Sequence, residues 1–294
     1  MKKYVQLIRM KHWIKNFLIF LPLIFSKAIF DFNKLILGII AFFSFSFIAS
    51  AVYIFNDLHD VENDKKHVIK KNRPIASGKV KPITAKIVML ILVVLSLIIG
   101  GVIFLLCSNI KSNIIFFMLL FSYFIINVAY SRGLKNKPII DVVILCYGFV
   151  VRVFIGSVVT GIPMSNYLYL TIMASSFFMG FGKRRNELVK KGNITRAVLE
   201  KYNKNFLDKF MYIYLTLTIV FYSIWCMDVS TIDRVGNNYM IWTIPLLLIA
   251  LMKYCLIIEG DSFGDPVDII LGDRLLLGIL FIECILIGLI IYVI

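Results

Sequence analysis

The chain has 294 residues, of which 60% are hydrophobic and 17% are charged, and its net charge at pH 7 is +15. Ordinary soluble domains are about 45–50% apolar, so this composition excludes the class of soluble globular proteins. Charge-free stretches of about 20 residues, the length that crosses a bilayer, recur along the sequence. We therefore predict an all-α integral membrane protein that folds as a single domain over residues 1–294.

Nine apolar stretches predict nine membrane-spanning helices. The first stretch is short and contains Pro22, and a basic, aromatic segment precedes it. Because this segment has no small-residue cleavage site, we interpret it as the start of an uncleaved helix and not as a signal peptide. The predicted helices, in chain order, cover residues 15–30, 35–56, 86–107, 112–130, 138–160, 165–183, 210–227, 238–257 and 275–294.

The distribution of Lys and Arg predicts the orientation of these helices. With nine spans, 27 of the 32 Lys and Arg residues lie on one side of the bilayer and four lie on the other. Because cytoplasmic loops are enriched in Lys and Arg, we expect the N-terminus on the cytoplasmic side of the cell membrane and the C-terminus on the opposite side. The same bias and anionic lipid headgroups account for the net charge, so no nucleic-acid partner is expected.

The densest group of acidic residues follows the second predicted helix and begins at Asn56. If that helix continued at about 100° per residue, Asp57, Asp60 and Asp64 would lie within an arc of about 60°, and Glu62 would face away. Like charges at this spacing destabilise a helix, so a compensating cation is expected. Carboxylate and amide oxygens are suitable ligands for Mg²⁺, which also binds substrate phosphate. The alternative interpretation is a solvated helix end.

A basic segment, Lys65 to Gly78, follows these acids directly. Basic residues beside a metal site favour the binding of a phosphorylated substrate. Arg73, fixed beside a proline, is the best candidate for a specific contact, and the backbone near Ser77 offers N–H groups where the next helix approaches. Most of the lysines here are interpreted as charges at the membrane surface.

The pattern NDxxDxxxD followed by RPxxSG resembles the signature of the UbiA superfamily of intramembrane prenyltransferases. The resemblance implies a bundle of nine helices with a Mg²⁺–diphosphate site at the cytoplasmic face. It also implies that Asn56, Asp57, Asp60 and Asp64 are metal-site residues, the three aspartates being catalytic.

The second half of the sequence departs from the usual pattern of that superfamily. Most members carry a second DxxxD motif near the loop between helices 6 and 7, whereas this chain has GKRRNEL, with Lys183, Arg184, Arg185 and Glu187. Arg binds phosphate through two parallel hydrogen bonds, so one metal cluster opposite a cationic cluster suits two anionic substrates. The alternative interpretation is a basic anchor that only sets topology.

Further motifs resemble one branch of the superfamily, the decaprenyl-phosphate phosphoribosyltransferases. They include WIKN at Trp13–Asn16, AYSRGLK at Ala129–Lys135 and DRLLL at Asp273–Leu277. The resemblance implies Mg²⁺-dependent transfer of 5-phosphoribose from phosphoribosyl diphosphate to a polyprenyl phosphate. Besides those already named, we predict these substrate-binding residues: Lys15, Asn16, Tyr130, Lys135, Asp141, Arg152, Tyr202 and Asp208.

Two other functions are considered. A UbiA-type prenyltransferase would keep the aspartates but use a prenyl diphosphate donor, and the missing second aspartate motif disfavours it. A transporter would show charges along a midplane path and internal repeats, neither of which is evident. Asp265, Asp268 and Asp273 form a second acidic group, for which a solvated loop is favoured over a metal site. Glu283 lies alone in the last predicted helix.

Overall fold

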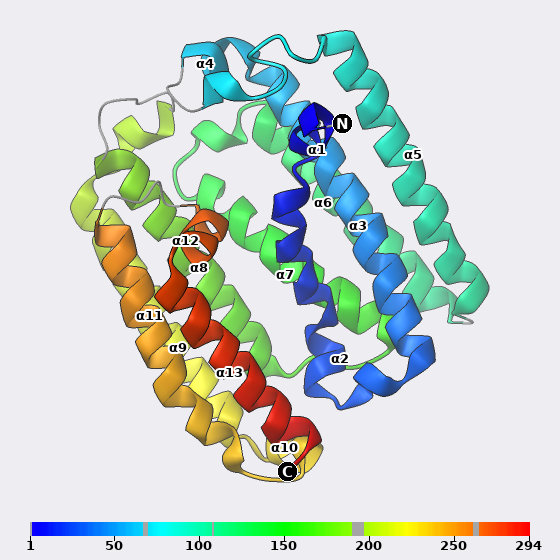
Figure 1. The fold of residues 1–294 in the computed structure, drawn as a ribbon, viewed down its shortest axis with the longest axis vertical. Coiled ribbons are helices and arrows are strands. Elements are labelled where there is room, and N and C mark those ends of the chain that lie inside the picture. Colours follow the sequence, from blue (N-terminus) through cyan, green and yellow to red (C-terminus); the bar gives the residue numbers. More distant parts are fainter. Residues whose placement is uncertain (1, 67–69, 108, 190–196, 261–264) are drawn as a thin grey trace.

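The computed structural model describes residues 2–66, 70–107, 109–189, 197–260 and 265–294, and every regular element in these ranges is a helix. The N-terminus lies beside α1 toward the end of the molecule that holds α4, and the C-terminus lies at the opposite end beside α10 (Figure 1). The shorter elements are α1 (Lys2–Leu7), η1 (Met10–Phe20), α2 (Leu21–Phe25), η2 (Ala28–Phe30), α4 (Val61–Lys66), η3 (Lys70–Asn72), η4 (Leu134–Asn136), η6 (Ala197–Lys201), α10 (Val229–Val235), η7 (Tyr239–Thr243) and α12 (Pro266–Gly272).

Seven helical segments in the described part of the chain are long and apolar enough to cross a membrane. The other two predicted spans are also helical but differ in kind. The first is the 3₁₀-helix η1 followed by the short α2, and the second is α8 (Asn166–Val189), whose last turns carry the GKRRNEL charges. The seven are α3 (Phe32–His59), α5 (Pro82–Leu106), α6 (Ile110–Ser131), α7 (Ile140–Thr160), α9 (Lys204–Met227), η7 with α11 (Ile244–Glu259), and α13 (Arg274–Tyr292).

Helix α7 is the central element, because it packs against η1, α2, α3, α6 and α8. Its contact with η1 is so close that a Cβ atom on Gly156 would lie 1.9 Å from the backbone oxygen of Ile19. Only glycine allows two backbones to approach to this distance. This contact fixes the position of η1 against α7, and with it the position of the polar residues of η1, which include Lys15 and Asn16.

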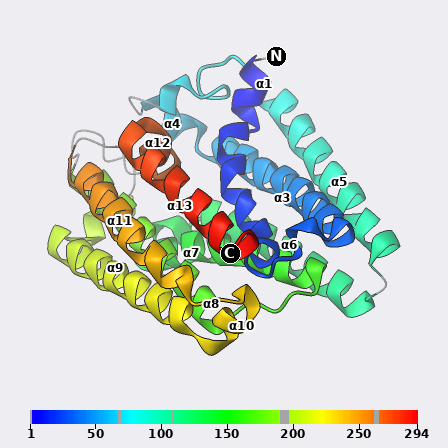
Figure 2. The ribbon, with the colours of Figure 1, turned by 60° about the horizontal axis from the view of Figure 1, so that its bottom comes forward.

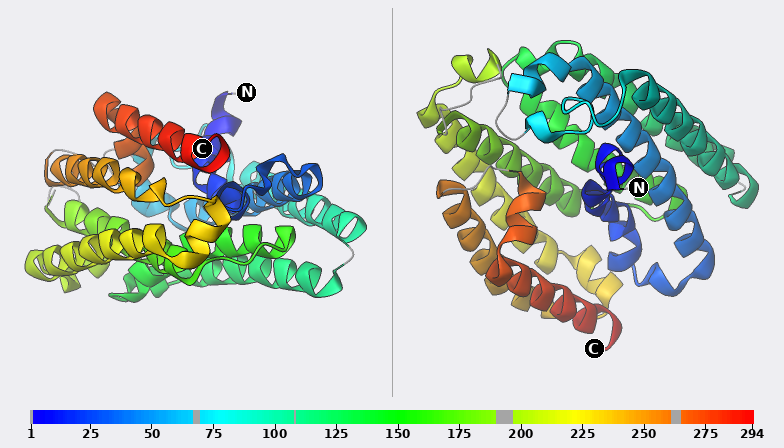
Figure 3. Two further views of the ribbon diagram at one scale, coloured as in Figure 1. Left: turned by 90° about the horizontal axis from the view of Figure 1, so that it is seen from below. Right: turned by 45° about the horizontal axis from the view of Figure 1, so that its top comes forward.

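The helices form two groups around α7 and η1. Helices α3, α5 and α6 lie on one side, and α8, α9, α11 and α13 lie on the other (Figures 2 and 3). The first group buries a core that includes Phe45, Phe116 and Ile155. The second buries Phe178, Leu207 and other apolar side chains between α8, α9 and α11. Charged residues at the α4 end of both groups are thereby brought to one end of the molecule.

The acidic motif does not lie on one continuous helix, contrary to the prediction. Helix α3 ends at His59, and Asp60 has φ −99° and ψ 11° with its N–H bonded to the oxygen of Asn56. Helix α4 then begins at Val61. Because ψ at Asp60 departs from the helical value near −42°, the chain bends there. Asp57 and Asp64 therefore approach each other from two different helices, and the predicted stripe of three carboxylates does not exist.

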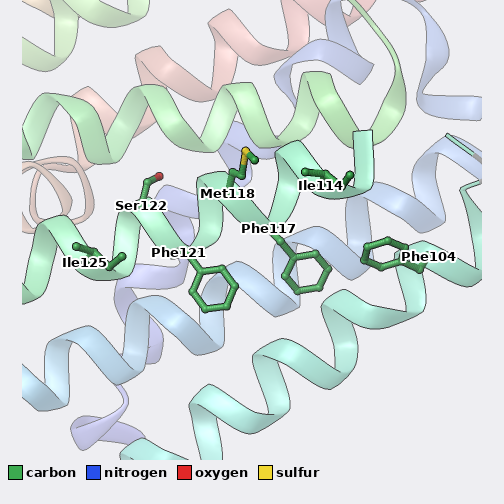
Figure 4. A pocket seen from close by; sticks show the side chains of 7 residues that line it. All are labelled: Phe104, Ile114, Phe117, Met118, Phe121, Ser122 and Ile125. Carbon is green, nitrogen blue, oxygen red and sulfur yellow. The ribbon is translucent and has the colours of Figure 1, made fainter. Parts of the chain in front are cut away.

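An apolar groove of about 680 Å³ lies along α6 and the end of α5. Its lining is Phe104, Ile114, Phe117, Met118, Phe121, Ser122 and Ile125, shown in Figure 4. Ser122, the polar member, is hydrogen-bonded to Tyr147 of α7. This groove contains no charged residue, so the chemistry of the molecule must be sought at the charged end of the bundle.

Candidate active site

Asp57 and Asp64 converge on one guanidinium. Nη1 of Arg73 lies 3.0 Å from Oδ1 of Asp57 and 2.7 Å from Oδ2 of Asp64. The aspartates are almost fully buried, with 3% and 4% of their surface exposed. Nη2 of Arg9 also lies 2.5 Å from Oδ1 of Asp57. We call these four residues the acidic cluster: two carboxylates that are each bound to at least one arginine.

Arg9 was not predicted as a site residue. It lies between α1 and η1 with φ 52° and ψ 47°, a left-handed conformation that residues other than glycine rarely adopt. Its guanidinium packs over the ring of Tyr53, 4.8 Å from the centroid. In the sequence Arg9 is one of several basic residues near the N-terminus, and only the fold distinguishes it from Lys2 and Lys3.

The acidic cluster has the ligands for one divalent cation. Burial raises the pKa of Asp64 even though Arg73 opposes this shift, so one guanidinium does not fully compensate the buried charge. Mg²⁺ is bound by one or two carboxylates, with water and phosphate completing the shell. No group of three His, Cys, Asp or Glu side chains around a common point is found in the described part of the chain. The fit is therefore to two carboxylates, Asp57 and Asp64.

The other two residues of the predicted metal site, Asn56 and Asp60, contact residues outside the acidic cluster. Asp60 forms an ion pair with Lys135 of η4, and Oδ1 of Asn56 accepts a hydrogen bond from Ser131 at 3.1 Å. These contacts tie the end of α3 to the end of α6. Ser77 is exposed and bonds to the backbone oxygen of Arg73, so it closes the turn that presents Arg73 and does not itself face the carboxylates.

Arg184, on α8, forms a network that is completely buried. Its Nε lies 2.5 Å from Asp141, its Nη1 lies 2.7 Å from Glu187, and its Nη2 donates to the hydroxyl of Tyr130 at 3.1 Å. Both Arg184 and Asp141 have 0% exposure. A buried guanidinium bound by two carboxylates and a phenol has at least three of its five N–H donors engaged. Direct phosphate binding by Arg184, as predicted from the sequence, would require this network to open.

Tyr202 holds Asp141 from the other side. Its hydroxyl donates to Oδ1 of Asp141 at 2.7 Å and accepts from the N–H of Ile139 at 2.6 Å. Burial, and also the bond to Asp141, raises the pKa of Tyr202, so the phenol remains a neutral donor. Ile139 has φ 69°, which is a true outlier for a β-branched residue, and its strained backbone places the start of α7.

Arg185 faces away from Arg184, toward α9 and α11. Its Nε lies 2.9 Å from Oδ1 of Asp208, and its Nη1 donates to the backbone oxygen of Ile258. Asn186 donates to the same oxygen at 3.0 Å. The structure therefore does not gather Arg185 and Asp208 with the acidic cluster but uses them to join three helices.

Lys183 and Lys15 share one carboxylate, that of Asp265. Nζ of Lys183 lies 2.9 Å from Oδ2, and Nζ of Lys15 lies 3.8 Å from Oδ1. Burial alone would raise the pKa of Asp265, but these two ammonium groups hold it far below its usual value. The prediction of a solvated loop is therefore wrong for Asp265, which also caps α12. We call Lys15, Lys183 and Asp265 the lysine pocket.

The remaining acids of that second group lie apart. Asp268 is exposed and pairs with Lys11, while Asp273 caps α13 and pairs with Lys253. The three aspartates thus contact different lysines and do not form a joint metal site. Glu283 is buried in α13 with 7% exposure, outside both clusters described here.

Arg152 lies deeper in the bundle, on α7. Its Nε donates to Oδ1 of Asn16 at 2.7 Å and its Nη1 donates to the backbone oxygen of Gly148. The guanidinium also lies over the rings of Phe45 and Tyr123, 4.7 and 5.5 Å from their centroids. Carbonyl oxygens and aromatic faces stabilise a cation without a carboxylate. Arg152 therefore anchors η1 to α7, and Asn16, which donates to Ser46, links η1 to α3.

Comparison with known proteins agrees with this geometry. Residues 17–265 match the UbiA prenyltransferase family. The chain is 32% identical to a decaprenyl-phosphate phosphoribosyltransferase of Mycolicibacterium smegmatis, over 92% of this chain and 87% of that protein. A protein of the same name from Corynebacterium glutamicum is 31% identical, over 96% and 85%. A UbiA homologue from Archaeoglobus fulgidus, solved with GPP and Mg²⁺, superposes with a TM-score of 0.70 at 20% identity, over 99% of this chain and 100% of that one.

Proposed function

The chain belongs to the UbiA prenyltransferase family, and on that premise we propose that it transfers 5-phosphoribose from phosphoribosyl diphosphate to a polyprenyl phosphate. The relatives that carry this name share about 31% identity over most of the chain, which supports the proposal. The reaction belongs to the glycosyltransferases, and the protein is an integral membrane enzyme.

The observation that carries this proposal is the presence of two separate polar clusters at one end of the bundle. The acidic cluster offers two carboxylates for a metal-bound diphosphate, and the lysine pocket offers two ammonium groups for another phosphate. A prenyl transfer onto a neutral aromatic acceptor involves one phosphorylated substrate. Transfer between a sugar diphosphate and a lipid phosphate involves two, and so uses both clusters.

Asp57 and Asp64 would hold Mg²⁺ in this proposal. When bound, Mg²⁺ would neutralise the negative charge that grows on the leaving diphosphate. With these carboxylates engaged, the guanidiniums of Arg9 and Arg73 are released to bind diphosphate oxygens through paired hydrogen bonds. We expect Asp60 and Lys135 to keep the end of α3 in place beside them.

The bond that forms joins an oxygen of the lipid phosphate to the anomeric carbon of the ribose, and the bond that breaks joins that carbon to the diphosphate. The attacking oxygen is already anionic, so the reaction needs no strong general base. Positioning of the two substrates and electrostatic stabilisation would then supply most of the rate. We expect Tyr130, whose hydroxyl accepts a hydrogen bond from Arg184, to orient substrate at the end of α6.

The sequence-based roles of three basic residues change under this proposal. We assign Arg184 and Arg185 to positioning, because each is bound by a carboxylate on a neighbouring helix. Arg152 is assigned to holding η1 through Asn16. Lys183 and Lys15 remain candidates for direct phosphate contacts. We further propose that the site faces the cytoplasm, where phosphorylated sugar donors are made.

One assay tests the proposal. Purified protein with Mg²⁺, radiolabelled phosphoribosyl diphosphate and a polyprenyl phosphate should give a labelled lipid, and omission of Mg²⁺ with a chelator should abolish it. The same preparation with a prenyl diphosphate and an aromatic acid serves as the competing reaction. Turnover of the prenyl diphosphate, with no labelled phosphoribosyl lipid, would reject the proposal in favour of a prenyltransferase.

A further inference from the structure

Helix η1 carries basic residues at every third position: Arg9 at its N-cap, then His12 and Lys15. A 3₁₀-helix has 3.0 residues per turn, so side chains at i and i+3 eclipse one another. These three residues therefore project from one face of η1. With a rise of about 2.0 Å per residue, Lys15 lies about 12 Å along the helix from Arg9.

The burial of η1 confirms this three-residue period. One face packs against α3 and α7, and its residues are Trp13, Asn16 and Ile19. Another face is exposed, and its residues are Lys11, Ile14 and Phe17. The basic face is half-buried between them, directed from the acidic cluster at Arg9 to the lysine pocket at Lys15.

The lysine pocket holds more positive than negative charge. Asp265 faces two ammonium groups, whereas Arg185 and Lys135 each face a carboxylate and Arg184 faces two. The side chains of Lys15, Lys183 and Asp265 keep 15%, 22% and 19% exposure, whereas that of Arg184 is completely buried.

His12 lies beside this pocket with an unused polar atom. Its ring packs 5.6 Å from that of Tyr53, and among the described residues its buried Nδ1 has no hydrogen-bond partner. Burial and the nearby Lys15 lower the pKa of His12 to about 4, so the ring is neutral at pH 7 and one of its nitrogens carries a proton. A neutral imidazole of this kind can donate to an oxygen anion.

We propose that the lysine pocket binds a phosphate monoester between Lys15 and Lys183, in place of the Asp265 carboxylate. Compact ammonium groups bind phosphate as point charges, and a carboxylate that bridges them in the free protein occupies the position of phosphate oxygens. The inference rests on the proposed function and deepens it. Two groups of the proposed substrates have this chemistry, the 5-phosphate of the donor and the phosphate of the lipid.

The test measures binding and not turnover. Full-length protein in lipid nanodiscs is titrated with ribose 5-phosphate and, separately, with farnesyl phosphate. We expect Lys15→Gln and Lys183→Gln each to weaken one of these probes by about tenfold or more, as expected for loss of a hydrogen bond to a charged group. The probe that is lost identifies which phosphate occupies the pocket.

Two further variants sharpen the test. Asp265→Asn should tighten the same probe several-fold, because it removes the competing charge while Asn still caps α12. Lys11→Gln is the matched control, since Lys11 lies on the exposed face of η1 and pairs with Asp268. It should leave binding unchanged. Equal loss in Lys11→Gln would reduce the effect to general surface charge and overturn the proposal.

The inference and the proposed function fail in different ways. If the wild-type protein makes the labelled lipid but both lysine variants bind both probes normally, the pocket assignment is wrong and the function stands. If the wild type makes no labelled lipid yet binds a probe through these lysines, the pocket stands and the reaction is wrong. If the wild type binds neither probe, the pocket assignment is overturned regardless of turnover. Weaker binding in Asp265→Asn would contradict the displacement of its carboxylate.

Discussion

At the scale of single residues, each buried carboxylate of the acidic cluster has its negative charge compensated by at least one arginine. Arg73 bridges Asp57 and Asp64, and Arg9 supports Asp57 from a strained backbone position. Buried carboxylates without such partners would be costly, because a charge removed from water loses its hydration. The partners of a buried charge therefore indicate what a ligand must replace when it enters.

Three acids of the motif offer a direct test of this cluster. Asp57→Asn and Asp64→Asn should each lower turnover at least about 100-fold, because each removes a proposed metal ligand. Glu62→Gln should retain nearly full turnover, because Glu62 is exposed and contacts Lys65 only through a surface ion pair. Labelled-lipid formation measures the effect, and thermal unfolding in detergent checks folding. Equal loss in all three variants would contradict the assignment.

His12 predicts a dependence of stability on pH. Burial and the neighbouring Lys15 lower its pKa to about 4, from an ordinary histidine value of 6.5. Between about pH 6.5 and 4, His12 is protonated in the unfolded chain but not in the folded chain. The free energy of unfolding is therefore highest above about pH 6.5 and decreases as the pH falls toward 4. The loss is at most about 3.5 kcal/mol, because the pKa is lowered by about 2.5 and each pKa unit corresponds to about 1.4 kcal/mol.

His12→Asn should flatten that part of the profile. The measurement is the midpoint of thermal unfolding in detergent between pH 7 and pH 4.5, compared with wild type. The Asp265 carboxylate does not change stability in this window, because its lowered pKa gives a stabilising effect that is constant above its unfolded pKa of about 4 and is lost only below that pH. An identical decline in wild type and variant would show that His12 does not titrate between the two states.

At the scale of elements, two local departures from the α-helix build the site. The break at Asp60 lets Asp57 and Asp64 meet around Arg73. The 3₁₀ winding of η1 directs Arg9 and Lys15 to one face. A continuous α-helix would leave Asp57 and Asp64 on one face but about 10 Å apart along its axis, and an α-helical η1 would turn Lys15 about 120° away from Arg9. The irregular segments therefore carry the chemistry, and the long helices position them.

The contact of η1 with α7 is tested at Gly156. Gly156→Ala should destabilise the protein by about 1–3 kcal/mol or more, because the new Cβ would lie 1.9 Å from the backbone of Ile19. Gly101→Ala on α5 is the control, since a Cβ there meets nothing within 4 Å. It should be neutral or slightly stabilising, as alanine favours helices over glycine. Thermal unfolding reports both, and equal stability of the two variants would contradict the close approach.

At the scale of the whole molecule, the two helical groups meet at α7 and η1, and charged ends from both lie together near α4 and α12 (Figure 1). The three residues of the lysine pocket come from positions far apart in the chain. They are Lys15 of η1, Lys183 of α8 and Asp265 at the start of α12. The lysine pocket therefore exists only when both groups are assembled. The apolar groove on α6 lies outside this junction.

The orientation in the membrane gives the last prediction. Because the basic loops should face the cytoplasm, alkaline phosphatase fused after Ile294 should be active in a bacterial host, and the same enzyme fused after Ser77 should be inactive. A green fluorescent protein fused at the same two points should show the opposite pattern. Phosphatase activity at Ser77 would place the acidic cluster on the outer face and contradict the proposed cytoplasmic site.

Much of this molecule follows from the sequence alone. Apolar stretches predict the helical segments because burying a backbone in lipid requires helices, and the motif around Asp57 indicates a site that binds a cation. The comparison with relatives agrees with the family inferred from that motif. The predicted continuation of the helix through Asp64 was wrong, because the backbone leaves the helical conformation at Asp60, and residue propensities do not reveal such a single-residue break.

Only the tertiary structure decided which charged side chains are available to bind a substrate. In the sequence Lys183, Arg184 and Arg185 are equivalent neighbours, yet they project in different directions from α8 and meet Asp265, Asp141 and Asp208. Arg9 was not predicted as a site residue and Asp265 was assigned to a solvated loop, yet each contacts a partner many residues away. The composition of a motif determines how much charge is present, but long-range packing determines which of it is neutralised and which remains open to a substrate.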